Sequence, residues 1–416
     1  MSKFKIRGGK RLYGEIKVCG SKNALLPVLA ATLLTRDWCL IKNVPNILDG
    51  KHLLEIISDL GAEVKLKKNQ VLIRANRISA NLSDKVRKLR GSILLAGALI
   101  PRLKKFKLPY PGGDLIGKRP IDTHLNMFED FGVKAKKNLD SFEVDASMLS
   151  PAKVVLSEIS VTATENALLC SVLIPGKTVI KLAAVEPHVI DLARFLNKMG
   201  AKISGIGTHT LKVEGVKKLH GAEHRLIPDS DEAMSLITLA VATRSNVLVS
   251  NLNLDFIEAG ISTLRRMGAN LDLDTNKVLV KSPKHRYFAS KIQSGLYPKL
   301  STDQIPPLAV LCTQAKGCSL IHEWMYENRL GYIPQLRKMG ANARILDPHR
   351  ALIFGPTPLH GINLRSLDIR AGMAILIAAL VAKGESILSD VYVIDRGYQK
   401  IESRLKDIGA EIERIE

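Results

Sequence analysis

The strongest constraint in this sequence is a pattern that occurs six times. Each copy is an amphipathic helical segment, closed by a glycine and followed by an alternating segment typical of a strand. The glycines are 68 to 72 residues apart, at Gly61, Gly132, Gly200, Gly268, Gly340 and Gly409. A glycine in this place favours the left-handed backbone of a helix C′ cap. Six copies at nearly constant spacing predict six related structural units.

Each repeat also contains a second helical segment, which is apolar on every side. These segments are 22–34, 90–100, 164–174, 231–242, 303–315 and 370–382. A helix that is apolar all round should be buried, whereas an amphipathic helix should cover a surface. Strand candidates lie between the helices, for example 69–75 and 209–216. We therefore expect an α/β fold in which each repeat has one buried helix, one surface helix and several strands.

The buried segments begin with charged or polar residues. Cations stand at Lys22, Arg90 and Arg370, where they oppose the positive end of the helix dipole. Helix N-termini bind anions, so cations placed there indicate an anionic ligand. The other starting residues are explained equally well as helix caps: Asn23, Thr164, Glu165, Asp231, Glu232 and Asp303.

The composition and charge of the chain limit the kinds of molecule that it is expected to bind. The formal net charge is +21, but the basic residues are spread along the chain and aromatics make up only 5%. We therefore expect aliphatic cores and no nucleic acid partner. Either small polyanionic substrates or merely a basic proteome explains the net charge. The longest apolar run, 371–382, is too short to span a bilayer, so no membrane insertion is expected.

Compartment and cofactors follow from a few further features. The N-terminal segment has charges but no apolar region typical of a secretory signal. The five cysteines are scattered without disulfide or metal-ligand spacing: Cys19, Cys39, Cys170, Cys312 and Cys318. These features predict a cytoplasmic protein without a metal or another cofactor, and we expect a monomer.

Eight segments carry a resemblance to a known family. They are "GSKNALLP", "RGSILLAGAL", "PGGDLIGKRPID", "EISVTATENALL", "STDQIPP", "YENRLGYIPQLRKMGA", "LDIRAG" and "YVIDRGYQKIESRLKDIGAEIERI". In this order and spacing the sequence resembles the UDP-N-acetylglucosamine 1-carboxyvinyltransferases, which are enolpyruvyl transferases. The resemblance covers nearly the whole chain.

The resemblance implies a two-domain inside-out α/β barrel. Each domain would be a threefold repeat of the helix-and-strand unit, with its parallel apolar helices buried. The first domain would span 22–227 and carry a catalytic loop at 111–123, and the second would combine 1–21 with 228–416. The active site would lie in the cleft between the domains.

The implied reaction is transfer of the enolpyruvyl group of phosphoenolpyruvate to the 3-hydroxyl of UDP-N-acetylglucosamine. Phosphate is released, in the first committed step of peptidoglycan synthesis. Two other functions stay open. One is the shikimate 3-phosphate enolpyruvyl transferase, which shares the fold. The other is a catalytically silent paralogue that acts as a basic binding protein.

Family matching assigns the cations to phosphoenolpyruvate. Lys22, Arg119 and Arg396 match the positions at its phosphate. Arg329, Arg370 and Arg396 match those around its carboxylate, and Arg90 matches a residue that supports the loop. Arginine suits both anionic groups because its planar guanidinium donates two parallel hydrogen bonds.

The remaining matches concern the UDP-sugar. Asp303 matches the carboxylate that contacts the acceptor hydroxyl, which makes it the candidate general base; it also suits a helix N-cap before Pro306 and Pro307. Asn23 and Met325 match sugar contacts. The other matches line the uridine at Arg119, Pro120, Ile121, Asp122 and Thr123, and the diphosphate at Ser160, Val161 and Thr162. Glu327 is interpreted as the structural partner of an arginine.

Five positions depart from the family pattern. Asp114 stands where the catalytic loop usually carries a cysteine, and we interpret it as the acid that protonates the methylene carbon of phosphoenolpyruvate. An aspartate is ordinarily ionised at neutral pH, so the closed site would have to raise its pKa. The other four departures concern nucleotide contacts: Thr123 for leucine, Thr162 for glycine, and Val185 and Ser230 for arginines.

Overall fold

The computed structural model describes residues 2–114 and 116–416, and these separate into two compact units. One, here called the N-terminal unit, comprises 20–114 and 119–227. The other, the C-terminal unit, comprises 2–19, 116–118 and 228–416. The chain changes from one unit to the other within two residues of the domain boundaries expected at 21/22 and 227/228. A segment of the loop, 116–118, belongs to the C-terminal unit instead.

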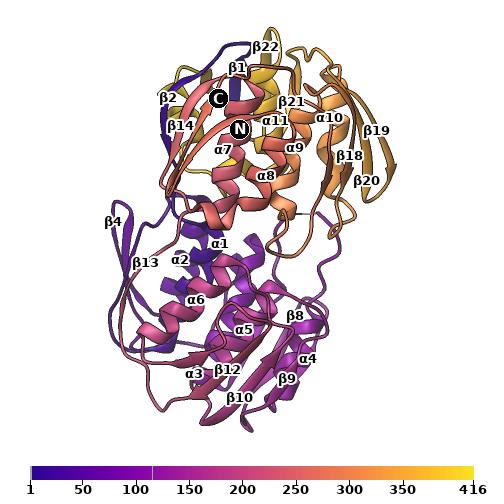
Figure 1. The fold of residues 1–416 in the computed structure, drawn as a ribbon. Helices are drawn as coiled ribbons and strands as arrows, with labels where there is room; N and C mark the ends of the chain where they lie inside the picture. Colours follow the sequence, from indigo (N-terminus) through magenta and orange to yellow (C-terminus); the bar gives the residue numbers. More distant parts are fainter. Residues whose placement is uncertain (1, 115) are drawn as a thin grey trace. The chain divides into compact units, whose positions relative to one another are not determined.

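The N-terminal unit contains three repeats (Figure 1). Its buried helices are α1 (Lys22–Ala31), α3 (Leu94–Leu103) and α5 (Val161–Ser171). Its amphipathic helices are α2 (Leu48–Asp59), α4 (Asp122–Asp130) and α6 (Pro187–Lys198). The strands form three sheets, in the orders β13 (Glu223–Arg225), β3 (Cys39–Lys42), β5 (Gln70–Arg74), β4 (Glu63–Lys67); β6 (Lys105–Pro109), β8 (Ser141–Asp145), β7 (Lys134–Lys137); and β11 (Lys202–Ser204), β12 (Thr210–Gly215), β10 (Gly176–Lys181), β9 (Lys153–Val155).

The C-terminal unit repeats the arrangement. Its buried helices are α7 (Ser230–Ala242), α9 (Ile305–Cys312) and α11 (Ile369–Val381), and each contacts the other two. Its outer helices are α8 (Glu258–Arg266), α10 (Tyr332–Lys338), α12 (Tyr392–Asp395) and α13 (Ile401–Lys406). The sheets have the orders β21 (Asn363–Arg365), β22 (Glu385–Ser389), β1 (Lys3–Arg7), β23 (Glu411–Ile415); β15 (Asn270–Asp274), β16 (Lys277–Lys281), β14 (Asn246–Ser250), β2 (Tyr13–Lys17); and β17 (Lys291–Gln293), β18 (Gly317–His322), β20 (Arg350–Gly355), β19 (Asn342–Asp347).

The six repeat glycines end their helices as the sequence predicts. Each has a positive φ, between +81° and +104°. In every repeat the residue after the glycine donates its N–H to the carbonyl five positions earlier, for example Ala62 to Ile57 and Ala201 to Leu196. This is the long hydrogen bond of a Schellman cap, which requires the left-handed backbone that glycine adopts without a Cβ penalty.

The N-terminal segment of the chain belongs to the C-terminal unit. Strand β1 pairs antiparallel with both β22 and β23, and β2 pairs parallel with β14. Figure 1 accordingly shows the two ends of the chain in neighbouring strands of one unit. In return, β13 at the end of the N-terminal unit pairs parallel with β3. The chain therefore changes unit near residues 20 and 228, and again on either side of the short segment that contains 116–118.

Each unit has its own hydrophobic core, built mainly from alanine, leucine, isoleucine and valine. This confirms the aliphatic cores expected from the low aromatic content. The buried helices are apolar on all sides because a neighbouring helix or a sheet packs against every face. In the part of the chain that the structure describes, no helix is long and apolar enough to cross a membrane.

Candidate functional site

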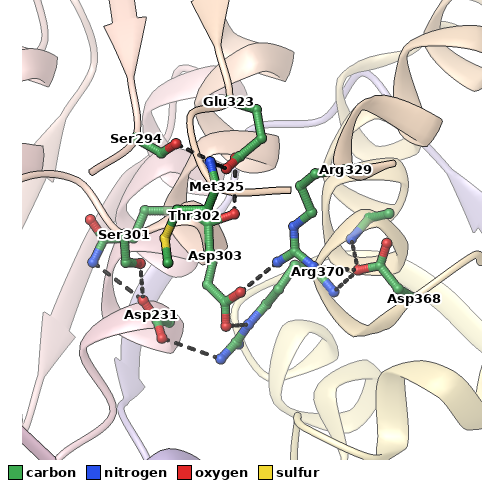
Figure 2. Close-up of polar contacts among 12 residues, drawn as sticks. Asp231, Ser294, Ser301, Thr302, Asp303, Glu323, Met325, Arg329, Asp368 and Arg370 are labelled. Carbon is green, nitrogen blue, oxygen red and sulfur yellow. Dashed lines mark hydrogen bonds and ion pairs between the residues drawn. The ribbon is translucent and has the colours of Figure 1, made fainter. Parts of the chain in front are cut away.

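The C-terminal unit brings two arginines and three aspartates from four segments into one ion-pair network (Figure 2). The Asp303 carboxylate accepts from the guanidinium groups of Arg329 and Arg370, the latter through Nε at 2.8 Å. The second carboxylate, Asp231, lies 3.4 Å from Arg370 Nη2. Arg329 also lies 3.5 Å from Asp368. Two of the three arginines predicted around a substrate carboxylate are therefore neighbours.

The starts of the buried helices create this network. Asp303 lies in the short 3₁₀ turn η5 (Thr302–Gln304), directly before α9. The helix N-cap interpretation of Asp303 is wrong, because Gln304 occupies that position and the carboxylate is turned to the arginines instead. Arg370 lies in the first turn of α11, where Asp368 caps the helix by accepting from the N–H groups of Arg370 and Ala371.

Arg329 and Arg370 are buried, which strengthens their electrostatic attraction for an anionic ligand. Arg329 and Arg370 are 3% and 2% exposed. Burial raises the pKa of Asp231 to about 6, although nearby Arg370 opposes the shift. The Nε–H of Arg329 has no hydrogen-bond partner among residues 2–114 and 116–416. A buried charged donor without a partner is costly, so this N–H is available for an anionic ligand.

Tyr398 holds Arg370 from its other side. The Arg370 Nη1 donates to the Tyr398 hydroxyl at 2.9 Å, and that hydroxyl also lies 3.0 Å from the Ser235 Oγ. Arg396, the third predicted carboxylate ligand, ends the short helix α12 two residues before this tyrosine. In the sequence "RGY", the candidate ligand Arg396 is therefore two residues from Tyr398, which supports the candidate ligand Arg370.

Met325, a predicted sugar contact, lies in the segment after β18. Its backbone N–H donates to the carboxylate of buried Glu323 at 3.0 Å. The other oxygen of that carboxylate accepts from the Thr302 hydroxyl, next to Asp303. Figure 2 shows Glu323 above Met325 and Thr302.

In the N-terminal unit, three predicted residues of the loop 111–123 lie near a fourth predicted residue, Arg90; residue 115 lies outside the described part of the chain. Arg119 donates to the backbone carbonyl of Asp114, and Arg90 donates to the carbonyl of Pro120 at 3.2 Å. Gly112 is required here, since a Cβ would lie 1.9 Å from the Arg87 carbonyl oxygen. Arg90 thus contacts the loop, and its supporting role stays a prediction.

The segment 116–118 is held by the turn after β18 in the C-terminal unit. The Glu327 carboxylate accepts the backbone N–H of Lys118 at 2.8 Å, and Asn328 donates to the Ile116 carbonyl at 3.1 Å. These contacts replace the arginine partner that we expected for Glu327, so that interpretation is wrong. A carboxylate suits this place because Gly117 leaves the room that it needs; a Cβ there would lie 2.5 Å from Glu327 Oε2.

The residues matched to the diphosphate surround the start of α5. Ser160 is the N-cap and accepts from the Ala163 N–H, while Val161 and Thr162 form the first turn. Thr162 Oγ1 lies 3.1 Å from Nε2 of buried His124 in α4. The Asn166 amide donates to Nδ1 of the same ring at 2.9 Å.

The tautomer of His124 follows from this network. The Gly97 N–H donates to Asn166 Oδ1, so the Asn166 nitrogen faces the imidazole as a donor. The Nδ1 atom must then accept, and Nε2 carries the proton and donates to Thr162. Burial, together with the smaller effect of the Arg90 charge, lowers the pKa of His124 to about 3, so the ring is neutral at physiological pH.

Other predicted site residues are at the ends of elements. Lys22 and Asn23 are the first residues of α1, behind the Ser21 cap. Ile121 precedes α4, which begins with Asp122 and Thr123. The exposed Asp122 forms an ion pair with Lys137, and Thr123 Oγ1 lies 3.0 Å from the Ser157 Oγ.

Sequence reasoning missed several members of these networks: Asp231 as an ion-pair partner, Glu323, Asp368, Tyr398, His124 and Asn166. Only one signal pointed to them. Each is a polar residue at the edge of an apolar segment, which also describes an ordinary cap. Their partners are as distant as 163 residues in the chain, and periodicity contains no information on such pairs.

Comparison with known proteins agrees with the fold and the motifs. Residues 6–405 match the family model of EPSP synthase (3-phosphoshikimate 1-carboxyvinyltransferase). The UDP-N-acetylglucosamine 1-carboxyvinyltransferase of Treponema denticola is 40% identical, with 99% of each chain covered. That of Bacteroides fragilis is 39% identical, with 100% of each covered.

Solved structures extend the likeness. The enolpyruvyl transferase NikO from Streptomyces tendae has a TM-score of 0.90 at 26% identity, covering 100% of this chain and 99% of that one. An EPSP synthase from Acinetobacter baumannii has a TM-score of 0.76 at 16% identity, covering 100% of both chains; it shows the fold alone. The chain therefore belongs to the enolpyruvyl transferase family, among the UDP-N-acetylglucosamine 1-carboxyvinyltransferases.

Proposed function

We propose that the chain transfers the enolpyruvyl group of phosphoenolpyruvate to the 3-hydroxyl of UDP-N-acetylglucosamine and releases phosphate, the first committed step of peptidoglycan synthesis. The observation that carries this proposal is a carboxylate held between two buried arginines, all three at family motif positions. It occurs in a chain that is 40% identical over almost its whole length to an enzyme of that name.

The arginines bind the three-carbon donor in this proposal. Arg329 and Arg370, with Arg396, contact the carboxylate of phosphoenolpyruvate, and the free Nε–H of Arg329 supports this role. Lys22, Arg119 and Arg396 contact its phosphate. Arg90 orders the loop through its hydrogen bond to the Pro120 carbonyl.

Two aspartates move the protons. Asp303 takes the proton of the 3-hydroxyl as the oxygen forms a bond to C2 of phosphoenolpyruvate, and Asp114 gives a proton to C3. The resulting adduct loses phosphate from C2 and a proton from C3, which restores the double bond of the enolpyruvyl group. The reaction needs no redox step, because only protons and phosphate are exchanged.

The UDP-sugar residues form the second part of the proposal. Asn23 and Met325 contact the sugar, and Arg119, Pro120, Ile121, Asp122 and Thr123 follow the uridine. Ser160, Val161 and Thr162 contact the diphosphate, for which the start of α5 offers free N–H groups. The Thr162 hydroxyl accepts from His124, so its own proton is free to donate to a phosphate oxygen.

A phosphate-release assay tests the function. The protein is mixed with phosphoenolpyruvate and either UDP-N-acetylglucosamine or shikimate 3-phosphate. We expect release with the first acceptor only. Release with the second acceptor alone would favour a shikimate-pathway enzyme, and release with neither would favour a silent binding paralogue. We also propose a cytoplasmic monomer, and light scattering on purified protein measures its mass.

A further inference from the structure

Glu323 is a buried charged residue to which the proposed reaction gives no role. Its exposed fraction is 0%. One carboxylate oxygen accepts from the Ser294 hydroxyl at 2.9 Å and from the Met325 N–H at 3.0 Å. The other accepts from the Thr302 hydroxyl at 2.9 Å. A buried carboxylate is expensive to maintain, and here three donors compensate for the lost water.

The three donors come from separate segments. Ser294 follows β17, Thr302 begins η5, and Met325 follows β18. The backbone of Glu323 is itself fixed, since its N–H donates to the His349 carbonyl at 2.7 Å and its carbonyl oxygen lies 2.8 Å from His349 Nδ1. Glu323 is therefore a rigid junction between these segments, and Figure 2 shows it above Thr302 and Asp303.

Two of these segments carry residues of the proposed reaction. Thr302 directly precedes Asp303, the proposed base, and Met325 is the proposed sugar contact. We propose that Glu323 is a positioning residue, which sets the distance between the base and the acceptor sugar through Thr302 and Met325. This inference rests on the proposed function. It predicts that Glu323 acts on the UDP-sugar and on the chemical step, and not on phosphoenolpyruvate binding.

The conservative variant Glu323→Gln should retain this geometry. Its amide oxygen can accept from Ser294 and Met325, and its NH₂ group can donate to Thr302, whose hydroxyl rotates to accept. Glu323→Ala removes all three bonds and leaves a backbone N–H and two hydroxyls without their acceptor. A shift of about 1 Å in a catalytic group can lower the rate roughly 100-fold.

The experiment compares steady-state kinetics of the wild type, Glu323→Ala, Glu323→Gln and Thr302→Val. For Glu323→Ala we expect kcat to fall roughly 10- to 100-fold and the KM for UDP-N-acetylglucosamine to rise, with the KM for phosphoenolpyruvate within about twofold. Glu323→Gln should stay within about fivefold of the wild type. Thr302→Val should lower kcat, and the double variant with Glu323→Ala should be no worse than Glu323→Ala alone, because one hydrogen bond is lost in both.

A matched control separates positioning from mere stability. Tyr287 is buried in the same unit and donates to the Val241 carbonyl at 2.6 Å, near the far end of α7 from Asp231. Tyr287→Phe should lower the melting temperature without changing kcat or either KM.

Three outcomes would overturn the inference. Glu323→Ala with wild-type kinetics would leave Glu323 a structural residue. Equal losses in Glu323→Gln and Glu323→Ala would show that its charge matters and its geometry does not. An effect on the KM for phosphoenolpyruvate alone would place it elsewhere in the reaction. A wild-type protein that is inactive with UDP-N-acetylglucosamine would instead overturn the proposed function, and this inference with it.

Discussion

The two units use the starts of equivalent buried helices in opposite ways. In the C-terminal unit these starts carry Asp231, Asp303 and Arg370, joined as a buried ionic network. In the N-terminal unit the start of α5 is joined through Thr162 and Asn166 to an imidazole whose pKa is about 3, and this network is neutral. The same threefold scaffold therefore supports two kinds of polar site.

The difference teaches what each site can do. An ionic network offers strong donors to a small anion, and it suffers when one charge is removed. A neutral network offers fixed hydrogen bonds with little dependence on salt, but it must stay uncharged to remain folded. The proposed division of labour follows this contrast, with carboxylate binding and proton removal in one unit and diphosphate binding in the other.

The largest expected effect concerns Asp114. If it is the proposed acid, Asp114→Ala and Asp114→Asn should lower kcat at least about 10³-fold, within the range for loss of general acid catalysis. Binding of UDP-N-acetylglucosamine, measured by calorimetry, should persist. Asp114→Cys should retain turnover, because a thiol holds its proton at neutral pH.

Fosfomycin provides the control for this residue. In the family that drug alkylates the loop thiol, and a carboxylate is a poorer nucleophile towards an epoxide. The natural protein should resist the drug, whereas Asp114→Cys should lose activity with time. Time-dependent inactivation of the natural protein, or normal turnover by Asp114→Ala, would remove Asp114 from the mechanism.

The second-largest effect is expected from Arg370→Ala, which breaks the ionic network. Arg370→Ala leaves Asp231 and Asp303 without their shared cation, which should lower the stability of the C-terminal unit by about 3–5 kcal/mol. Lost substrate contacts should lower kcat/KM roughly 10- to 200-fold. Urea unfolding and initial rates measure the two effects.

Arg365→Ala is the matched control for Arg370→Ala. Arg365 pairs with Asp390 at 2.6 Å but its side chain is 71% exposed. Its removal should cost no more than about 1 kcal/mol, with unchanged kinetics. Similar losses in both variants would contradict the importance of burial for this network.

The sequence predicted the scaffold better than these networks. The glycine caps and the apolar helices were identified because helix periodicity and C′ glycines are local properties of the chain, and all six glycines have the expected positive φ. The partners of Asp303 are 26 and 67 residues away, and its cap interpretation was wrong. The family resemblance identified Arg329 and Arg370, but it did not predict that both would pair with Asp303. Such pairing depends on packing between repeats.

The third prediction concerns the pH dependence of stability, which tests whether the network around His124 must stay neutral. The His124 pKa is lowered from 6.5 to about 3, mainly by burial, so the folded form excludes a proton that the unfolded chain accepts below pH 6.5. Stability from this residue is therefore complete above pH 6.5 and is lost as the pH falls towards 3. By pH 5 the loss should be about 2 kcal/mol.

The control for this test is His124→Gln, which cannot titrate. Its stability relative to the wild type should improve by about 2 kcal/mol between pH 7.5 and pH 5. Urea unfolding can be followed by Trp38, which lies in the N-terminal unit, in a Trp324→Phe background that removes the other tryptophan. A constant difference between the two proteins over this range would contradict a neutral, buried His124.

The smallest effect concerns the hydroxyl that Thr162 adds to the network. In the family this position is usually glycine, and here Oγ1 accepts the Nε2–H of His124 at 3.1 Å. Thr162→Ala would leave that buried N–H without its acceptor, because Asn166 already fixes the other ring nitrogen. The expected cost is about 1–2 kcal/mol in the unfolding of the N-terminal unit, whereas Thr162→Ser retains the hydroxyl and should stay within about 0.5 kcal/mol. If the hydroxyl also donates to the diphosphate, Thr162→Ala should raise the KM for UDP-N-acetylglucosamine and Thr162→Ser should not. Equal behaviour of the two variants would show that the methyl group, and not the hydrogen bond, explains the departure at this position.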